Sequence, residues 1–281
     1  MGSVGQVSVL VSGFDTSEGP TFDRQGNLFF VNSSTSSIMK RAVDGTVTEF
    51  ANTGGIPAGL AFHRDGSLYV ADEGDGHHGV LRVTKDGQIE TVIDAYLGRP
   101  LNGANDLVFD RDGTLYFSDP WGSSAENPIG GFYRLFADGR LERIDDGLAF
   151  PNGVAVNAEG TAVFLAETYR TRILRYRLRP GESVGEREVF AEVGGPPGPD
   201  GMAFDVDGNL YVAHFDGGRV DVLDPTGRLL APIPVPGRQP TNVAFGGQAR
   251  RTLVITEYET HAIYQTEVAI PGRPLFGEVS D

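Results

Sequence analysis

Short apolar runs that alternate with polar residues recur along the whole chain, and many pairs of runs are joined by Asp-Gly or a similar dipeptide. Six segments repeat this arrangement: GPTFDRQGNLFFVN, AGLAFHRDGSLYVAD, NDLVFDRDGTLYFSD, NGVAVNAEGTAVFLAE, DGMAFDVDGNLYVAH and TNVAFGGQARRTLVITE. Alternation with a period of two is typical of β-strands, and Asp-Gly is a strong signal for a tight hairpin turn. Each segment is therefore predicted to be a β-hairpin.

The stretches between these copies predict two further strands in each repeat. GVLRVTKDGQIETVI and GGFYRLFADGRLERI alternate in the same way around another Asp-Gly turn. Units of roughly 40 to 48 residues with about four strands each fall in the period range of propeller blades, and no helical periodicity competes with them. The sequence thus predicts an all-β fold, a six-bladed β-propeller that spans residues 1–281 as a single domain.

The two ends of the chain predict how the ring is closed. The last repeat shows only three strands and ends in HAIYQTEVAI, whereas QVSVLVS near the N-terminus has no hairpin of its own. Pairing the two would complete the sixth blade and remove an open strand edge. We therefore predict a propeller closed by the N-terminal strand.

One position is shared by all six repeats, four residues before the aromatic residue or valine near the end of the first strand. It is occupied in turn by Glu18, Ala58, Asn105, Asn152, Asp200 and Thr241. Equivalent positions at the mouth of the innermost strands of a propeller face the central axis, so we expect these side chains to converge. Two carboxylates and two amides form an all-oxygen set, which suits a hard cation such as Ca²⁺ better than copper or zinc. Glu18, Asn105, Asn152 and Asp200 are the predicted ligands of one divalent cation, preferably Ca²⁺, with Mg²⁺, Mn²⁺ or Zn²⁺ as alternatives.

Turn formation is the competing explanation for this column of residues. Asn and Asp are common at turns because they bond their own backbone, so a single member of the column indicates little. The shared register and Glu18, for which turn chemistry has no use, favour a site. We interpret the Pro and Gly that flank Asn152 in PNGVAV and Asp200 in PDGMAF as residues that fix a turn presenting the middle residue.

A second calcium pattern is present in DVDGNLYVAHFD. There Asp205, Asp207 and Asn209 imitate the start of a helix-loop-helix calcium loop. The glycine comes too early for such a loop, no flanking helices are evident, and the same turn recurs at residues 110–113. These residues are therefore predicted to form a hairpin turn.

A further column of polar residues lies at the ends of the second strands: Asn32, Asp72, Asp119, Glu167, His214 and Glu257. They could form an outer polar shell around the axis, but we favour a role in starting loops or bonding neighbouring blades. The loops DEGDGHHGV and DPWGSSAENPIGG begin there and break the repeat, which is typical of segments that select a ligand. From these loops His78 and Trp121 are candidate substrate contacts; the alternatives are a solvated histidine and a core tryptophan.

Composition narrows the range of partners. The 281 residues include no cysteine and carry a formal net charge of −15. Disulfides and thiolate metal sites are thereby excluded, and the acidity argues against nucleic acid and anionic membranes as partners. The N-terminal MGSVGQVSVL lacks a basic segment followed by an apolar run, and no stretch approaches a membrane-spanning length. We expect a soluble, cytoplasmic protein that binds a small molecule.

Four motifs, SEGPTF, NDLVFDRDGTLYFSDPWG, PNGVAV and PDGMAFD, together resemble the gluconolactonase and regucalcin family of calcium-dependent lactonases, which also includes enzymes acting on fluorophosphates. The resemblance spans essentially the whole chain. It implies a six-bladed propeller with one divalent cation on the axis, held by Glu18, Asn152 and Asp200. It also implies that Asn105 lies beside the metal and contacts the metal or the substrate.

One departure from the family pattern concerns the substrate. Regucalcin-like members carry an arginine two residues before the asparagine of the ND motif, where this chain has Gly103. The pattern LNxxND of bacterial gluconolactonases fits better, with Leu101, Asn102, Asn105 and Asp106.

The predicted function is a lactonase that opens a small sugar or aldonic lactone whose carbonyl is polarised by the cation. Asp200 or Glu18 would orient or deprotonate the attacking water, and Asn105 and Asp106 would bind ring hydroxyls. The sequence has no cysteine, so a cysteine nucleophile is excluded. Three alternatives are a phosphotriesterase of the diisopropyl-fluorophosphatase type, a metal-free propeller similar to strictosidine synthase, and a propeller that only binds. The polar loops disfavour the first, and the oxygen-rich column disfavours the other two.

Overall fold

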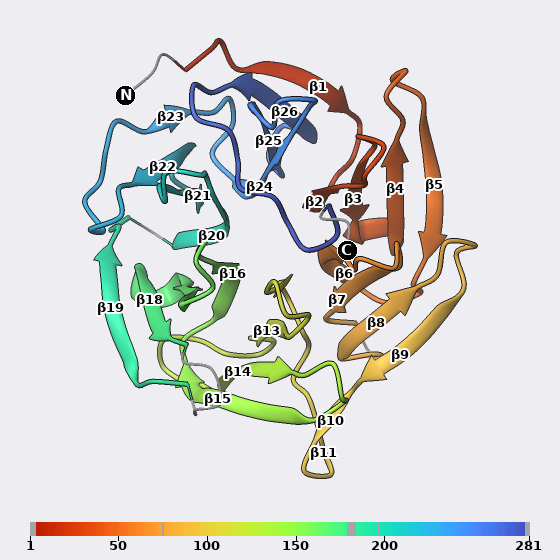
Figure 1. Cartoon of the computed structure of the whole chain (residues 1–281), viewed down its shortest axis with the longest axis vertical. Coiled ribbons are helices and arrows are strands. Elements are labelled where there is room, and N and C mark those ends of the chain that lie inside the picture. Colours follow the sequence, from red (N-terminus) through yellow and green to blue (C-terminus); the bar gives the residue numbers. More distant parts are fainter. Residues whose placement is uncertain (1–3, 75, 179–183, 196, 279–281) are drawn as a thin grey trace.

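Six four-stranded antiparallel sheets surround a central axis in the computed structural model, which describes residues 4–74, 76–178, 184–195 and 197–278 (Figure 1). This arrangement confirms the predicted six-bladed β-propeller. The first three blades consist of β2 (Ser17–Phe22), β3 (Leu28–Asn32), β4 (Ser37–Arg41) and β5 (Val47–Asn52); β6 (Pro57–Phe62), β7 (Leu68–Asp72), β8 (Gly79–Val83) and β9 (Ile89–Ile93); and β12 (Leu107–Phe109), β13 (Leu115–Asp119), β14 (Gly130–Leu135) and β15 (Leu141–Leu148).

The fourth and fifth blades repeat this order, and the sixth joins the two ends of the chain. These blades consist of β16 (Pro151–Val156), β17 (Ala162–Glu167), β18 (Arg172–Arg177) and β19 (Arg187–Glu192); β20 (Gly198–Phe204), β21 (Leu210–Phe215), β22 (Arg219–Leu223) and β23 (Ile233–Pro234); and β24 (Pro240–Gly246), β25 (Thr252–Glu257), β26 (Ala262–Glu267) and β1 (Ser8–Ser12). The antiparallel pairing of β1 with β26 confirms closure by the N-terminal strand.

Four short elements interrupt the repeat. A small hairpin projects from the rim between the second and third blades (Figure 1). Single 3₁₀ turns follow β3 and β17 at equivalent places in their blades. The elements are β10 (Ala95–Tyr96), β11 (Arg99–Pro100), η1 (Ser33–Thr35) and η2 (Thr168–Arg170).

The Asp-Gly segments form hairpin turns, as predicted. In the turn between β20 and β21, Oδ1 of Asp205 accepts the backbone N–H groups of Asp207 and Asn209 at 2.9 and 2.8 Å. Oδ2 of Asp205 accepts the amide of Asn209 at 2.8 Å. The carboxylate of Asp205 thus bonds its own turn, which supports the hairpin interpretation of DVDGNLYVAHFD over a calcium loop.

Apolar side chains of adjacent blades pack against each other all around the ring. Each pair of neighbouring blades encloses a cluster of buried residues, from Leu60 and Val31 between the first two blades to Phe30 and Ile263 between the first and the last. Innermost strands are almost entirely buried, as in β16, whereas an outermost strand such as β9 has no fully buried residue. The interfaces between blades therefore contain the core, and the innermost strands are held around the axis.

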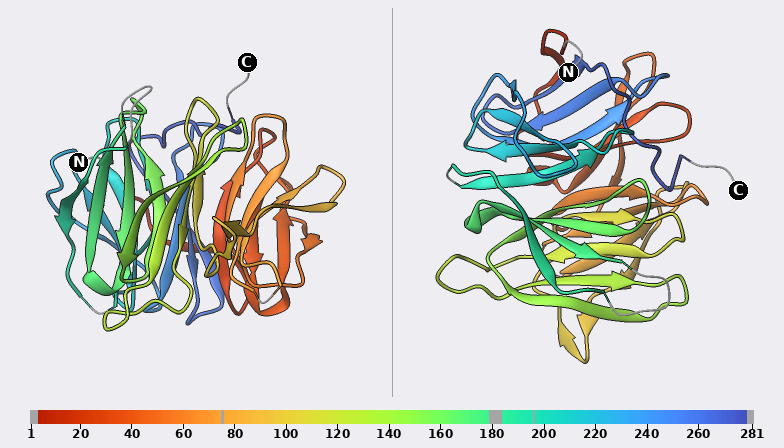
Figure 2. Two further views of the ribbon diagram at one scale, coloured as in Figure 1. Left: turned by 90° about the horizontal axis from the view of Figure 1, so that it is seen from below. Right: turned by 60° about the vertical axis from the view of Figure 1, so that its left-hand side comes forward.

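The strands run between the two faces of the ring (Figure 2), so each innermost strand presents its first and last residues to opposite ends of an axial channel. After β26 the chain crosses the channel at one end, where Val206 N–H donates to Pro271 O at 2.9 Å and Arg273 N–H to Phe204 O at 3.1 Å. No helix in the described part of the chain is long and apolar enough to span a membrane.

Candidate functional site

A cavity of about 470 Å³ opens at the end of the channel where the innermost strands begin. All six residues of the first predicted column line this cavity: Glu18, Ala58, Asn105, Asn152, Asp200 and Thr241. Glu18, Asn152 and Asp200 are 7%, 5% and 7% exposed. The propeller thus brings together the four oxygen-bearing side chains that the sequence singled out, one from each of four blades.

Irregular pairing of the innermost strands places these side chains at the axis. The register of β16 with β17 shifts between Pro151 and Val154, and that of β20 with β21 between Pro199 and Met202. PNG and PDG therefore lie inside strands, and the predicted turn at these motifs is wrong. A bulge frees the intervening residue from the regular alternation of faces, so its side chain can point into the channel.

The glycines after these residues are explained by close contact between blades. A Cβ atom on Gly153 would collide with the carbonyl oxygen of Asp200, and one on Gly19 with that of Ala58. A Cβ on Gly201 would collide with the side chain of Asn242 in the next blade. Glycine at this position therefore lets neighbouring innermost strands approach each other around the axis.

Two residues that the sequence analysis missed support the column. Nδ2 of Asn242 donates to Oε2 of Glu18 at 3.0 Å, and Gly19 N–H donates to the same oxygen at 2.6 Å. Nδ2 of Asn105 donates to Oε1 of Glu73 at 2.9 Å, and Glu73 itself lines the cavity. Asn242 and Glu73 each follow a residue of one of the two predicted columns, so a search of the adjacent positions would have found them.

Five of the six residues in the second column accept hydrogen bonds from backbone N–H groups and lie outside the cavity lining, as favoured above, whereas His214 bonds the side chain of Asp221. Oδ1 of Asp72 accepts the N–H groups of Ile56 and Gly74, and Asp119 accepts those of Asn102 and Gly103. In contrast, the residues that directly follow this column line the cavity in five blades: Ser33, Glu73, Thr168, Phe215 and Tyr258. Phe215 is the last residue of β21, and the other four directly follow the ends of their strands.

Burial and mutual repulsion make the carboxyl groups of the cavity hard to ionise. Burial raises the pKa of Glu18 to about 8, and the charges of Asp106 and Glu73 add to the shift, while the Gly19 N–H opposes it. Burial also raises the pKa of Glu73 to about 7. For Asp200, burial and then the charges of Glu18, Asp106 and Glu73 raise the pKa well above its ordinary value. The site therefore gathers carboxyl groups whose ionised form a bound cation would stabilise.

The donor set fits a hard divalent cation. Glu18 and Asp200 offer carboxylate oxygens, and Asn105 and Asn152 offer amide oxygens. Within the described residues, no three His, Cys, Asp or Glu side chains are placed to hold a metal ion by themselves, so a cation here would need the amide oxygens. None of the described residues that line the cavity is Lys, Arg or His.

Aromatic residues form much of the cavity wall. Trp121 lies there, as expected, and it is joined by Phe150, Tyr169, Phe215 and Tyr258. Trp121 and Tyr169 are 43% and 41% exposed, and the rings of Phe150 and Tyr169 are 5.2 Å apart. The polar loops had suggested a polar pocket, but most of their polar side chains lie outside the cavity. The wall is therefore more apolar than the sequence suggested.

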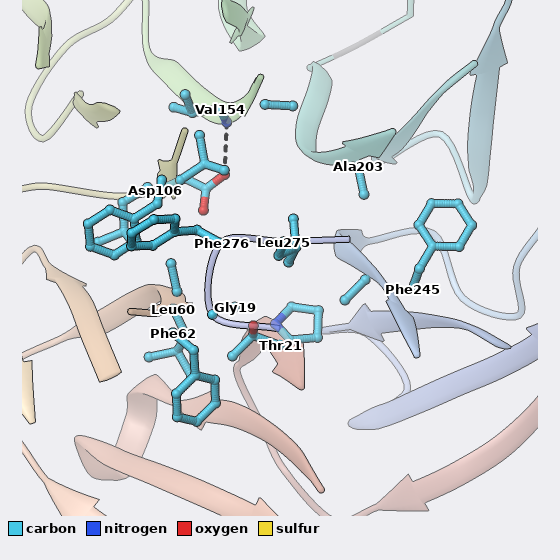
Figure 3. A pocket seen from close by; sticks show the side chains of 18 of the residues that line it. Gly19, Thr21, Leu60, Phe62, Asp106, Val154, Ala203, Phe245, Leu275 and Phe276 are labelled. Atoms are coloured by element: carbon cyan, nitrogen blue, oxygen red, sulfur yellow. Dashed lines mark hydrogen bonds between the residues drawn. The ribbon is translucent and has the colours of Figure 1, made fainter. Parts of the chain in front are cut away.

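His78 and Asp106 lie outside the lining of this cavity. Nδ1 of His78 is 2.8 Å from the carbonyl oxygen of Asn102, in the loop ahead of β12. Asp106 is buried, and its Oδ2 accepts the N–H of Val154 at 2.8 Å. Its side chain turns toward the other end of the channel, where it lines a second cavity of about 80 Å³ (Figure 3). The structure thus separates these two predicted substrate contacts from Asn105 and Trp121.

Comparisons with known proteins agree with the propeller fold. Residues 16–259 match the profile of the family described as SMP-30/gluconolactonase/LRE-like region. Diisopropyl-fluorophosphatase from Loligo vulgaris is 30% identical, over 93% of this chain and 91% of its own length. Gluconolactonase from Zymomonas mobilis is 30% identical, over 88% of this chain and 78% of its own length. The solved structure of a gluconolactonase from Xanthomonas campestris has a TM-score of 0.83 at 28% identity and covers 95% of this chain and 90% of its own.

Proposed function

The chain belongs to the SMP-30/gluconolactonase/LRE-like family, and on that premise we propose that it is a divalent-cation-dependent hydrolase that opens small lactones. One observation carries the proposal. Four oxygen-bearing side chains from four blades converge on one cavity, and the carboxylates among them are buried without a basic residue in the described wall. Burial of these carboxylates is energetically unfavourable unless a cation compensates their negative charge.

Glu18, Asn105, Asn152 and Asp200 would hold the cation, and Ca²⁺ suits their oxygen donors best. When bound, the cation polarises the carbonyl of an ester and stabilises the negative charge that develops on its oxygen. The chain contributes rigidity, because Glu18, Asn152 and Asp200 lie on innermost strands that neighbouring blades hold in place. Asn105 lies two residues before the innermost strand β12.

Asp200 and Glu18 are the candidates for orienting the attacking water. Oε2 of Glu18 already accepts two hydrogen bonds, from Gly19 N–H and from the Asn242 amide. Among the groups that most strongly affect the carboxyl group of Asp200, only the backbone N–H of Gly201 donates a hydrogen bond to it. We therefore assign the water to Asp200, and Glu18 to cation binding.

The wall of the cavity favours an uncharged substrate with an apolar face. Phe150, Tyr169 and Trp121 offer flat apolar surface, while Ser33, Thr168 and Thr241 line the same cavity with hydroxyl groups that can bond the oxygens of a sugar ring. Sugar lactones and aliphatic lactones both satisfy this description. The aromatic wall also favours a second candidate function, phosphotriester hydrolysis, because a neutral fluorophosphate would pack against the same surface.

A pH-stat assay tests the proposal. Metal-free protein is given glucono-δ-lactone, galactono-γ-lactone, a simple aliphatic lactone or diisopropyl fluorophosphate, each with CaCl₂ or with chelator. We expect calcium-dependent acid release from at least one lactone. Turnover of the fluorophosphate alone would favour the second candidate function, and equal rates with and without calcium for all four compounds would refute both.

A further inference from the structure

Glu73 lies in the loop after β7 and belongs to neither of the predicted columns. It is 8% exposed and lines the axial cavity. Its Oε1 accepts a hydrogen bond from Nδ2 of Asn105 at 2.9 Å, across the boundary between the second and third blades. A buried carboxylate that bonds a candidate cation ligand from the next blade needs an explanation, because burial of such a group is unfavourable.

The loop that carries Glu73 is held firmly. Glu73 N–H donates to Ile56 O at 2.9 Å, and Oδ1 of Asp72 accepts the N–H groups of Ile56 and Gly74 at 2.9 and 2.8 Å. On the other side, a Cβ atom on Gly103 would lie 3.1 Å from Cα of Glu73. These contacts fix the position from which the Glu73 carboxylate reaches Asn105.

The backbone of Asn105 is also fixed. Its N–H donates to Ser118 O at 3.0 Å, and its carbonyl oxygen accepts the N–H of Gly59 at 2.7 Å. With the backbone fixed, the Asn105 side chain can still rotate its amide group. A carboxylate can only accept hydrogen bonds, so the NH₂ group of Asn105 must face Glu73 and Oδ1 must lie on the opposite side of the amide.

We propose that Glu73 is a positioning residue that orients the Asn105 amide so that Oδ1 is presented to the axial cation. This inference rests on the proposed function. Asn242 holds Glu18 in a comparable way through the bond from Nδ2 to Oε2 at 3.0 Å. Partners of this kind typically contribute about 10–100-fold to the affinity for a metal.

Calcium titrations of metal-free protein by isothermal calorimetry test the inference without any assay of activity. Glu73→Met has a similar length but no acceptor, and we expect its calcium affinity to fall about 10–100-fold. Glu73→Gln keeps an acceptor oxygen, so we expect its calcium affinity to lie between those of Glu73→Met and the wild type, with a residual loss from the missing charge. Glu126→Gln removes one charge from an exposed residue of a neighbouring loop and serves as the matched control, with unchanged affinity.

A double-mutant cycle separates positioning from direct contact. If Glu73 acts through Asn105, then Glu73→Met has no further effect on calcium affinity in an Asn105→Ala background. A full further loss of calcium affinity in that background would show that the Glu73 carboxylate itself contacts the ion, and so would equal affinities of Glu73→Gln and Glu73→Met. Either result would overturn the inference. Wild-type calcium affinity in Glu73→Met would overturn it as well.

Two further outcomes are distinguishable. If circular dichroism shows that Glu73→Met is unfolded, Glu73→Ala takes its place in the same cycle with the same expectations. A wild-type protein that binds no calcium overturns the cation site of the proposed function, and the inference with it; a wild-type protein that binds calcium as tightly as folded Glu73→Met overturns the inference alone.

Discussion

The two ends of the axial channel are built from the same six innermost strands but differ in chemistry. At one end, the first residues of these strands surround the 470 Å³ cavity with carboxylate, amide and hydroxyl groups. At the other, the later residues of the same strands, such as Leu60, Val154 and Phe245, surround the 80 Å³ cavity (Figure 3). Leu275 and Phe276 of the C-terminal segment lie across that second end (Figure 3).

The side chains change from polar to apolar within two or three residues along each strand. This change separates the residues of the candidate site from residues that stabilise the fold. The apolar end gains stability from packing, since Phe276 is buried and its ring lies 5.3 Å from that of Phe109. The opposite end buries carboxyl groups whose ionisation is unfavourable without a cation. Asp106 and Asn242 stand at the border, where four other blades have glycine. One repeat can thus support both stability and chemistry.

Asp200→Asn should produce the largest effect at the polar end. Loss of one of two carboxylate ligands and of the candidate water-orienting group should lower kcat/KM about 10³-fold, a loss typical of groups that stabilise a transition state electrostatically. Calcium affinity should fall as well, as measured by calorimetry. Asp207→Asn, an exposed residue of the hairpin turn in the same blade, is the matched control. Full calcium binding together with full turnover in Asp200→Asn would contradict the assigned roles.

Phe276→Ala should act at the apolar end only. Removing a buried aromatic ring should lower the free energy of unfolding by about 3 kcal/mol, as measured by urea denaturation. Calcium affinity of the folded protein should stay unchanged. Leu97→Ala, at an 86% exposed residue of the projecting hairpin, should change the free energy of unfolding by less than about 0.5 kcal/mol. A parallel loss of calcium affinity in Phe276→Ala would show that the two ends are coupled.

Calcium removal should destabilise the protein most at high pH. The raised pKa values of Glu18, about 8, and Glu73, about 7, mean that the folded metal-free protein holds protons more tightly than the unfolded chain. Its stability should therefore decrease as pH rises from the ordinary carboxyl value of 4.5 through 8. Calcium at 100 times its dissociation constant should add roughly 2.7 kcal/mol, or about 5–10 °C in Tm.

Differential scanning fluorimetry at pH 5 and pH 8, with CaCl₂ or with KCl of equal ionic strength, measures this effect. We expect a larger shift of Tm by calcium at pH 8, where the carboxyl groups ionise on their own. Equal shifts at the two pH values would indicate that calcium binds away from Glu18 and Glu73.

The sequence predicted the fold well because its signals are local and repeated. Alternating strands joined by Asp-Gly or related turns recur from blade to blade, and the unpaired segment 6–12 identified the closing strand. The axial column was accessible for the same reason, since one register relates Glu18, Asn105, Asn152 and Asp200.

Features that depend on contacts between blades were harder to predict from the sequence. Glu73 and Asn242 matter because of neighbours in other blades, and each lies one residue beyond a column that the repeats define. Asp106 follows Asn105 directly, yet it turns to the other end of the channel. The polar loops led to the wrong expectation of a polar pocket. Phe150 reaches the cavity from the end of another blade's loop, and Tyr169 reaches it from a 3₁₀ turn.

Phe150→Ala should produce the smallest effect on activity. It should show whether the aromatic wall of the cavity acts separately from the candidate cation ligands at its axial end. Phe150 lines the cavity and packs against Tyr169, but it donates no polar side-chain atom to a cation. Loss of its ring should lower kcat/KM for an aliphatic lactone or fluorophosphate about fivefold to tenfold, because an aromatic contact contributes about 1 kcal/mol. The effect on glucono-δ-lactone should be smaller, since its hydroxyl groups can still bond the polar residues of the cavity, and calcium affinity should not change. Val189→Ala, at a 49% exposed residue on the rim of the fourth blade, is the control. An equal loss for apolar and hydroxylated substrates would show that Phe150 shapes the axial end and that the two surfaces of the cavity are not separate.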